Sequence, residues 1–320
     1  MDKSFAARIT LCSLPRLLRQ SGGSMQYSFL FTLLAAGFLH LAAVSFANAQ
    51  AVPISLVRDH VVVVHGNVGD LKKLNFIVDT GGRTILDRSI AEKLHLHGAP
   101  SQTHVIDGDL RGTDIFLPEI GIGPVQQRNF PVTVLDLSDL QRELGTRIDA
   151  LVGLDLLAGH SFRIEYIAQR IVFGPVCDRE QWVDFQKDGS FLVLKAEYGG
   201  QHLNLMLDTG TSALVLFRQR GLKTPSSEGE SQGANLMGHF KLSEIAAPGV
   251  RLGQAEFRNP AAFFTDDRHL SQYQFDGLLG VSGLCVREIA VDFERGRFSW
   301  EPQGADSSCN PTYARLRLQR

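Results

Sequence analysis

The sequence has little of what would mark a specialised class of protein. Its 320 residues include only 4 cysteines, too few for a disulfide-dense miniprotein. Lys and Arg number 32 against 34 Asp and Glu, so no overall positive field would recruit nucleic acid. With 44% hydrophobic residues, the composition excludes a disordered chain, a collagen-like repeat and a polytopic membrane protein. An ordinary globular protein remains, with enough chain for two domain-sized cores.

The one long apolar run lies near the N-terminus. Four basic residues and one acid precede it, the run covers residues 29–46, and it ends in Ala47-Asn48-Ala49. This order is typical of a secretory signal peptide with a small-x-small cleavage site. We predict that residues 1–49 form a signal peptide removed on export to the periplasm or the medium. The alternative is an uncleaved membrane anchor, because about 18 apolar residues can just span a bilayer.

Export also sets the expectation for the cysteines. The predicted mature chain keeps Cys177, Cys285 and Cys309. An odd number in an oxidising compartment predicts at most one bridge and a free thiol. A bond from Cys309 to either of the other two is possible, and the sequence does not choose between them. No base beside Cys177 marks it as a reactive thiol, so we expect it to be structural.

The rest of the chain repeats itself. The segment 76–82 returns as 205–211, so that Asp208 follows Asp79 by 129 positions (208 − 79). Further blocks recur in the same order: 120–129 as 250–259, 150–154 as 277–281, and 164–173 as 291–300. Such repetition indicates a duplicated domain, and two copies are too few for a solenoid. We predict an N-terminal lobe at 50–177, a linker at 178–190, a C-terminal lobe at 191–303 and a tail at 304–320.

Between the repeated blocks the patterns favour strands. Residues 60–68 and 71–78 are rich in Val, Leu and Ile around Gly69-Asp70, which predicts a hairpin, and the second copy repeats this pattern. Only short helices fit, such as 89–94 with Ser89 as its cap. The polar segment 225–233 is expected to be a flexible loop. These patterns predict an all-β protein of two small lobes.

Two Asp-Thr-Gly triplets, beginning at Asp79 and Asp208, carry the candidate chemistry. Each follows an apolar strand, and the glycine lets the backbone turn sharply and present the carboxylate. Pseudo-twofold packing of two similar lobes would bring the two carboxyls face to face. Because two carboxyls in one site cannot both ionise cheaply, we expect them to share one proton, one acting as acid and the other as base.

These segments resemble the pepsin and retropepsin superfamily of aspartic peptidases, in a bacterial two-lobed form. Leu151-Val152-Gly153 and Leu278-Leu279-Gly280 match the second signature of that superfamily. The resemblance implies two β-barrel lobes with a cleft between them, catalysis by Asp79 and Asp208, and no metal or other cofactor. It implies supporting roles for Thr80, Gly81, Gly82, Thr209, Gly210 and Thr211 in the active-site loops, and for Gly153 and Gly280 in the ψ-loops. Thr80 and Thr209 are expected to brace the two loops by hydrogen bonds between the lobes.

The superfamily covers its cleft with a β-hairpin flap. The corresponding stretch lies near residues 105–112, where Gly108 is the flap candidate and the tyrosine of pepsins is missing. The two active-site loops also differ, because Gly82 has no hydroxyl whereas Thr211 has one. A hydroxyl donor would lower the pKa of Asp208, which predicts that Asp208 is the charged partner and Asp79 holds the proton.

Other polar clusters receive structural interpretations. His95-x-His97 has no third metal ligand at a recognisable spacing, so no metal site is expected there. Asp107-Gly108-Asp109 is expected to be a turn rather than a calcium loop. Gly121-Ile122-Gly123 is expected to be a hairpin turn rather than a dinucleotide loop.

Two functions are compatible with the sequence. The first is an exported aspartic endopeptidase whose partner is a polypeptide substrate and not a nucleic acid. The second is a catalytically inactive protein that binds extended peptides in the same cleft. Because one chain supplies both halves of the site, we expect a monomer that is a pseudo-dimer in cis, with membrane contact only if the signal segment is retained.

Overall fold

The computed structural model describes residues 49–105, 108–218, 222, 227–236, 238–246, 249–257, 261–265, 274–281 and 284–303. The predicted signal peptide, up to residue 48, and the predicted tail at 304–320 lie outside this part of the chain. Within the described ranges, no helix is long and apolar enough to cross a membrane.

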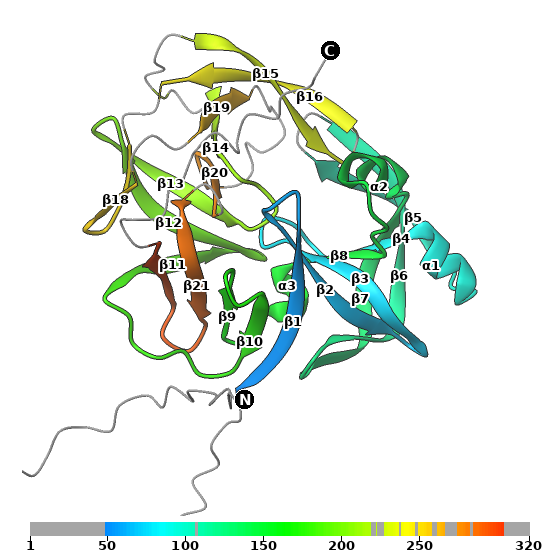
Figure 1. Cartoon of the computed structure of the whole chain (residues 1–320). Helices are drawn as coiled ribbons and strands as arrows, with labels where there is room; N and C mark the ends of the chain where they lie inside the picture. The colour runs from blue at the N-terminus through cyan, green and yellow to red at the C-terminus, as the bar shows by residue number, and fades with distance from the viewer. Residues whose placement is uncertain are drawn as a thin grey trace, which may run out of the picture. The chain divides into compact units, whose positions relative to one another are not determined.

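Strands dominate both repeats (Figure 1). The first repeat contains β1 (Gln50–Val57), β2 (Val61–Val68), β3 (Leu71–Val78), β4 (Ile85–Asp87), β5 (Ala99–Val105), β6 (Gly108–Ile122), β7 (Val125–Leu135), β8 (Ala150–Val152), β9 (Phe162–Glu165) and β10 (Arg170–Phe173). The second contains β11 (Gln181–Asp188), β12 (Phe191–Tyr198), β13 (Gln201–Asp208), β14 (Leu214–Phe217), β15 (Ser227–Asn235), β16 (Gly238–Ile245), β17 (Val250–Leu252), β18 (Ala255–Phe257), β19 (Ala262–Thr265), β20 (Gly277–Gly280), β21 (Val286–Asp292) and β22 (Arg297–Pro302). Short helices α1 (Arg88–Lys93), α2 (Ser138–Leu144) and α3 (Leu154–Leu157) belong to the first repeat.

The sheet of the first lobe closes into a barrel. Strands β2, β3, β8, β4, β7 and β6 pair in that order, and β6 pairs again with β2. The predicted hairpin of β2 and β3 turns at Gly69, whose φ of +53° suits a glycine. The predicted turn between β6 and β7 contains Gly123, also at φ +53°. In a small closed barrel each strand turns one of its two faces toward the interior, which explains the alternation of apolar residues along the strands.

The second lobe repeats this topology. β13 pairs with β12 on one side and in parallel with β20 on the other, as β3 does with β2 and β8. β14 pairs antiparallel with β20, as β4 does with β8. In the sheet of each lobe, therefore, a short strand (β8 or β20) lies between the strand that leads into the acid loop (β3 or β13) and the strand that follows that loop (β4 or β14). The duplication read from the sequence is present in the fold.

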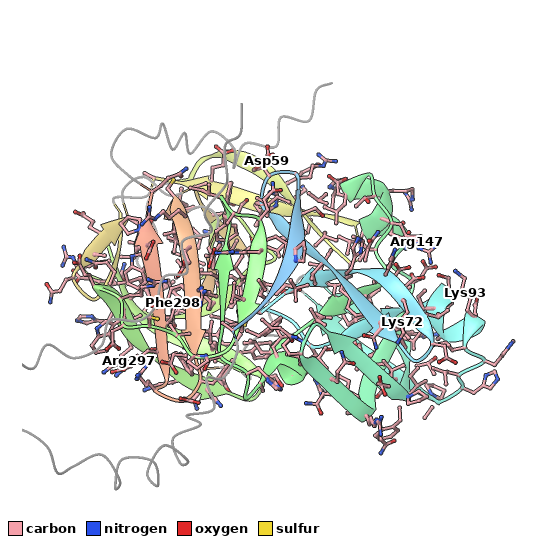
Figure 2. The ribbon with its side chains drawn as sticks, turned by 60° about the horizontal axis from the view of Figure 1, so that its bottom comes forward. Asp59, Lys72, Lys93, Arg147, Arg297 and Phe298 are labelled. Carbon is pink, nitrogen blue, oxygen red and sulfur yellow. The ribbon has the colours of Figure 1, made fainter. Side chains whose placement is uncertain are left out.

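A third sheet joins the two repeats. Its antiparallel order is β1, β10, β9, β21, β22 and β11. At its centre β9 of the first repeat pairs with β21 of the second, with Arg163 opposite Ala290. The largest core cluster contains buried side chains from both lobes and from this sheet, among them Phe162, Val291 and Phe298. Figure 2 shows Phe298 next to Arg297 on β22.

Two segments that looked irregular in sequence form strands. The expected flexible loop at 225–233 was wrong, because Ser227–Asn235 is strand β15 and pairs with β16 along most of its length. Residues 178–190, predicted as a linker, contain β11, which pairs with β22 in the joining sheet and with β12 in the second lobe. The guanidinium of Arg297 packs over the ring of Trp182 on β11. Cζ of Arg297 lies 3.7 Å from the ring centroid. Neither segment is apolar, so partner strands rather than composition determine their structure.

Helix α1 begins one residue earlier than predicted. Its cap is Asp87, whose carboxylate accepts a hydrogen bond from the N–H of Ser89 at 3.0 Å. Ser89, the predicted cap, donates its own hydroxyl to the same carboxylate at 2.5 Å.

Cys177 and Cys285 are both disulfide-bonded. Neither supplies a thiolate nucleophile, which agrees with the structural role expected for Cys177. Cys309 lies outside the described residues.

Candidate active site

Each Asp-Thr-Gly loop folds back onto its own acid. Asp79 follows the last residue of β3, and Asp208 is the last residue of β13. The N–H of Gly81 donates to Oδ1 of Asp79 at 3.0 Å, and the N–H of Gly210 donates to Oδ1 of Asp208 at 2.7 Å. The main chain therefore holds one oxygen of each carboxyl in place.

The structure brings the two acids together. Their carboxyls are joined by a side-chain hydrogen bond. The glycine of each loop lies against the acid of the other lobe. A Cβ placed on Gly81 would lie 2.5 Å from Cγ of Asp208, and one on Gly210 would lie 3.1 Å from Oδ1 of Asp79. At Gly81 even an alanine would collide with the acid opposite, so this glycine is required by the close approach.

Thr80 and Thr209 brace the two loops across the lobes. The N–H of each donates to Oγ1 of the other, at 3.1 Å from Thr80 and 3.0 Å from Thr209. Each hydroxyl in turn donates to a carbonyl of the opposite strand, Thr80 to Leu207 at 2.9 Å and Thr209 to Val78 at 2.8 Å. Both threonines are buried. These four bonds fix the separation of the loops and hence of the two carboxyls.

The second-signature glycines lie where a strand passes beneath each loop. A Cβ on Gly153 would lie 2.2 Å from the carbonyl oxygen of Gly82, and one on Gly280 would lie 2.4 Å from the backbone nitrogen of Ala213. Real Cβ atoms do not approach backbone atoms so closely. Glycine is therefore the residue that allows this ψ-loop packing in both lobes.

Burial and mutual repulsion keep a proton in the pair. Burial raises the pKa of Asp79 above its ordinary value, against the effect of the Gly81 N–H bond. Burial, followed by the charge of Asp79, raises the pKa of Asp208 well above its ordinary value. Two neighbouring carboxylates in a desolvated site are costly, so one shared proton is the favoured state.

The predicted asymmetry between the acids, with Asp208 charged and Asp79 protonated, stays a prediction. The hydrogen bond from Thr211 to Asp208 comes from its main-chain N–H. A main-chain donor does not depend on the threonine hydroxyl, so the difference between Gly82 and Thr211 carries less weight than the sequence suggested.

Sequence reasoning missed a second support of the first loop. The N–H and hydroxyl of Thr84 both donate to the carboxylate of Asp155, at 3.0 and 2.6 Å, and the N–H of Gly153 donates to the Thr84 hydroxyl at 3.2 Å. Asp155 thereby ties the strand after the acid to α3 and to the ψ-loop. The position of Thr84 in the second repeat is occupied by Ala213 (84 + 129). A comparison of the two repeats at this position was the available signal.

The hairpin of β5 and β6 in the first lobe carries the flap candidate. Gly108 begins β6 and pairs with Val105, and residues 106–107 between them are outside the described part. Leu110 on this hairpin packs against a cluster of buried first-lobe side chains: Val61, Val63, Ile77, Ile85, Leu135, Leu137, Ile148 and Leu151. We call this set the first-lobe apolar cluster. Ile77 precedes Asp79 by two residues, so the cluster adjoins the active-site strand.

The second-lobe hairpin also reaches this cluster. Leu236, at the turn between β15 and β16, packs against it. Nε2 of His239 lies 3.5 Å from Oε2 of Glu143 on α2. Arg58, which lies in the turn between β1 and β2, pairs with the same carboxylate at a distance of 3.6 Å. Asp59 labels this turn in Figure 2. Hairpins from both lobes therefore contact the first lobe, which the sequence did not indicate.

Metal ligands do not gather within the described ranges. No group of three or more His, Cys, Asp or Glu side chains there could hold an ion.

Two copies of one lobe, each presenting a carboxyl on a glycine-containing loop over a ψ-shaped strand crossing, define a two-lobed pepsin- or retropepsin-like fold. A family model described as aspartyl protease matches the sequence twice, over residues 64–156 and 194–282. Each match contains one acid and one ψ-loop glycine, and together they cover more than half of the chain. The chain belongs to the aspartyl protease family. Among curated proteins, no sequence matches it.

Proposed function

We propose that the protein is an active, exported aspartic endopeptidase that works as a monomer. The observation that carries this proposal is the hydrogen-bonded pair of Asp79 and Asp208, in which burial raises both pKa values and the charge of Asp79 raises that of Asp208 further. Such a pair supplies an acid and a base in one site. The intact cross-brace of Thr80 and Thr209 supports activity, because a protein that only bound peptides would not need fixed carboxyl separation.

The chemistry needs only these two groups and water. The ionised carboxylate takes a proton from a water molecule held between the acids as its oxygen bonds to the scissile carbonyl carbon. The protonated carboxyl gives its proton to the carbonyl oxygen, which forms a neutral tetrahedral diol. The carboxyl that took the water proton passes it to the amide nitrogen, and the other carboxylate accepts a proton from a diol hydroxyl. The C–N bond then breaks and releases an amine and a carboxylic acid. Asp79 and Asp208 supply the initial base and the initial acid between them, because the pKa values of both are raised.

Two features support export. Strand β1 begins at Gln50, the first residue after the predicted cleavage site, so cleavage there would leave every described strand intact. Cys177 and Cys285 are disulfide-bonded, as suits an oxidising compartment. The proposed location is the periplasm or the medium, with a membrane tether as the alternative if the signal segment is retained. N-terminal sequencing of the protein recovered from a secreting host tests this, since a chain starting before Gln50 would contradict cleavage there.

The direct test of activity is cleavage of an unfolded protein by the purified chain across a pH series, with and without a statine-type inhibitor. Asp79→Asn and Asp208→Asn are expected to lose activity to a similar extent and without additivity, because the acids act as a unit. Tight peptide binding without cleavage by the folded parent protein would favour the peptide-binding alternative.

The monomer is tested by light scattering combined with active-site titration. One chain supplies both acids and both braces, so we expect one titratable site per chain. One site per two chains would contradict this.

A further inference from the structure

Arg83 is placed beside the acid pair by the first active-site loop. It follows Gly82, whose Cα is so near the acid that a Cβ there would lie 3.0 Å from Oδ2 of Asp79. The main chain of Arg83 packs over the ψ-loop, where its Cα would lie 2.9 Å from a Cβ on Gly153. Its side chain is exposed. A permanent positive charge thus emerges from a rigid loop within four positions of Asp79.

This guanidinium has no acidic partner among the described residues. Most other arginines of the described chain do have one, as Arg147 has in Asp149 at 2.6 Å and Arg170 in Glu165 at 2.6 Å. Arg83 is therefore available to a group from outside the fold. An exposed arginine costs little to leave in water, but a carboxylate brought beside it in a complex would gain a charge-assisted, bidentate pair.

The second loop does not repeat this charge. The position of Arg83 corresponds to Ser212 in the second repeat (83 + 129), and Ser212 is half-buried. The two sides of the acid pair thus differ by one full charge, although their loops share the Asp-Thr-Gly turn. A substrate lying across both loops would meet a cation on the first-lobe side and a small neutral hydroxyl on the other.

We propose that Arg83 is a specificity-determining residue that selects polypeptides with an acidic side chain near the scissile bond, on the first-lobe side. This inference rests on the proposed peptidase function. It narrows the substrate class from unfolded protein in general to segments carrying Asp or Glu close to the cleaved bond. Arg83 has no part in the proton transfers, so its loss is expected to change preference more than turnover.

The test uses a set of peptides of one parent sequence that is cleaved at a single bond. Each of the three positions on either side of that bond carries Glu, Gln or Lys in turn, and kcat/KM is measured for every peptide. The protein is expected to prefer Glu over Gln at a position on one side by about fivefold, the size of a partly exposed charge pair. Arg83→Ser should abolish this preference, Arg83→Lys should keep part of it, and Arg83→Glu should shift it toward Lys.

Lys93 supplies a control of the same charge. It is exposed in the last turn of α1 and has no ion-pair partner among the described residues. Lys93 lies outside the acid loops and outside the flap candidate. Lys93→Ser removes one positive charge and should leave the preference intact. Equal loss in both variants would reduce the effect to net charge and overturn the proposal, as would an unchanged preference in Arg83→Ser.

Failure of the endopeptidase proposal can be distinguished from failure of the Arg83 proposal. If the parent protein cleaves none of the peptides, the endopeptidase proposal fails while the arginine remains testable by binding. Asp208→Asn, and the same variant with Arg83→Ser added, are then titrated with the fluorescent Glu and Gln peptides. Tighter binding of the Glu peptide than of the Gln peptide that disappears on Arg83→Ser supports the role of Arg83. If each protein binds the Glu and Gln peptides with equal Kd values, that role is refuted.

Discussion

The main-chain N–H of Thr80 donates to the hydroxyl oxygen of Thr209 at 3.1 Å, and the N–H of Thr209 donates to the hydroxyl oxygen of Thr80 at 3.0 Å. Each threonine is therefore both a donor and an acceptor to the other lobe. The two lobes cannot move apart at this point without breaking four buried hydrogen bonds. Stability between the lobes and geometry within the acid pair therefore depend on the same groups.

Thr80→Ala should destabilise the protein and abolish most activity. It leaves the N–H of Thr209 and the carbonyl of Leu207 buried without their partner, at a cost of about 2 kcal/mol or more. Thr80→Ser keeps the hydroxyl and should stay within about 1 kcal/mol of the parent. Denaturant unfolding followed by fluorescence measures both. Equal stability of the alanine and serine variants would contradict the brace.

Asp208→Asn should stabilise the protein increasingly as pH rises. Because burial raises the pKa of Asp208, the folded chain binds more protons than the unfolded chain between the ordinary value of 3.8 and the raised one. The free energy of unfolding of the parent therefore falls as pH rises through that window, and the asparagine variant escapes the fall. The difference between the two proteins should be smallest in acid and grow toward neutral pH.

Asp136→Asn gives a control of opposite sign. Hydrogen bonds from the N–H and side chain of Ser138 lower the pKa of Asp136, so its stabilising effect is present above the ordinary value and is lost as pH falls. This variant should be less stable than the parent at neutral pH and approach it in acid. Parallel curves for all three proteins would show that neither pKa shift affects folding.

Thr211→Ala should leave the acidic limb of the pH–rate profile unchanged. The donors to Asp208 from this loop are the main-chain N–H groups of Gly210 and Thr211, which alanine retains. A measurable shift of the lower apparent pKa in a folded variant would restore a role for the hydroxyl.

Leu236→Ser should loosen the second-lobe hairpin without unfolding the protein. Its side chain packs on the first-lobe apolar cluster, so a polar replacement removes the apolar part of that contact. Amide hydrogen exchange in β15 and β16 should quicken, and KM should rise if the hairpin helps to hold substrate. Phe116→Ser, at an apolar side chain 63% exposed, is the control and should change neither quantity. Unchanged exchange in both variants would show that Leu236 does not hold the hairpin.

The repeat made much of this site predictable from sequence. The apolar run before each acid, the following Thr-Gly pair and the later apolar-apolar-Gly element impose local geometry that depends on few distant residues. The hairpin of β2 and β3 was predictable for the same reason, because its turn at Gly69 and its flanking Val and Ile residues are contiguous.

Features set by distant partners were not predictable. Residues 227–235 are polar and glycine-rich, yet they form β15 because β16 offers a complementary edge. The bond between Thr84 and Asp155 joins residues 71 positions apart, and nothing local marks either of them. The raised pKa values of the two acids depend on desolvation, which the lobes create only when they pack.

The pairing of Arg163 with Ala290 lies on the local twofold axis between the repeats, because the two residues are also equivalent in the duplication (163 + 127). In an assembly of identical chains, a residue on such an axis must face its own copy. Two arginines would then repel each other at the centre of the joining sheet. Here one side keeps the arginine, paired with Glu165 at 2.8 Å, and the other carries a buried methyl group. Self-pairing of the first repeat alone would bring two arginines together here, whereas the duplicated chain replaces one of those charges with the buried methyl group of Ala290.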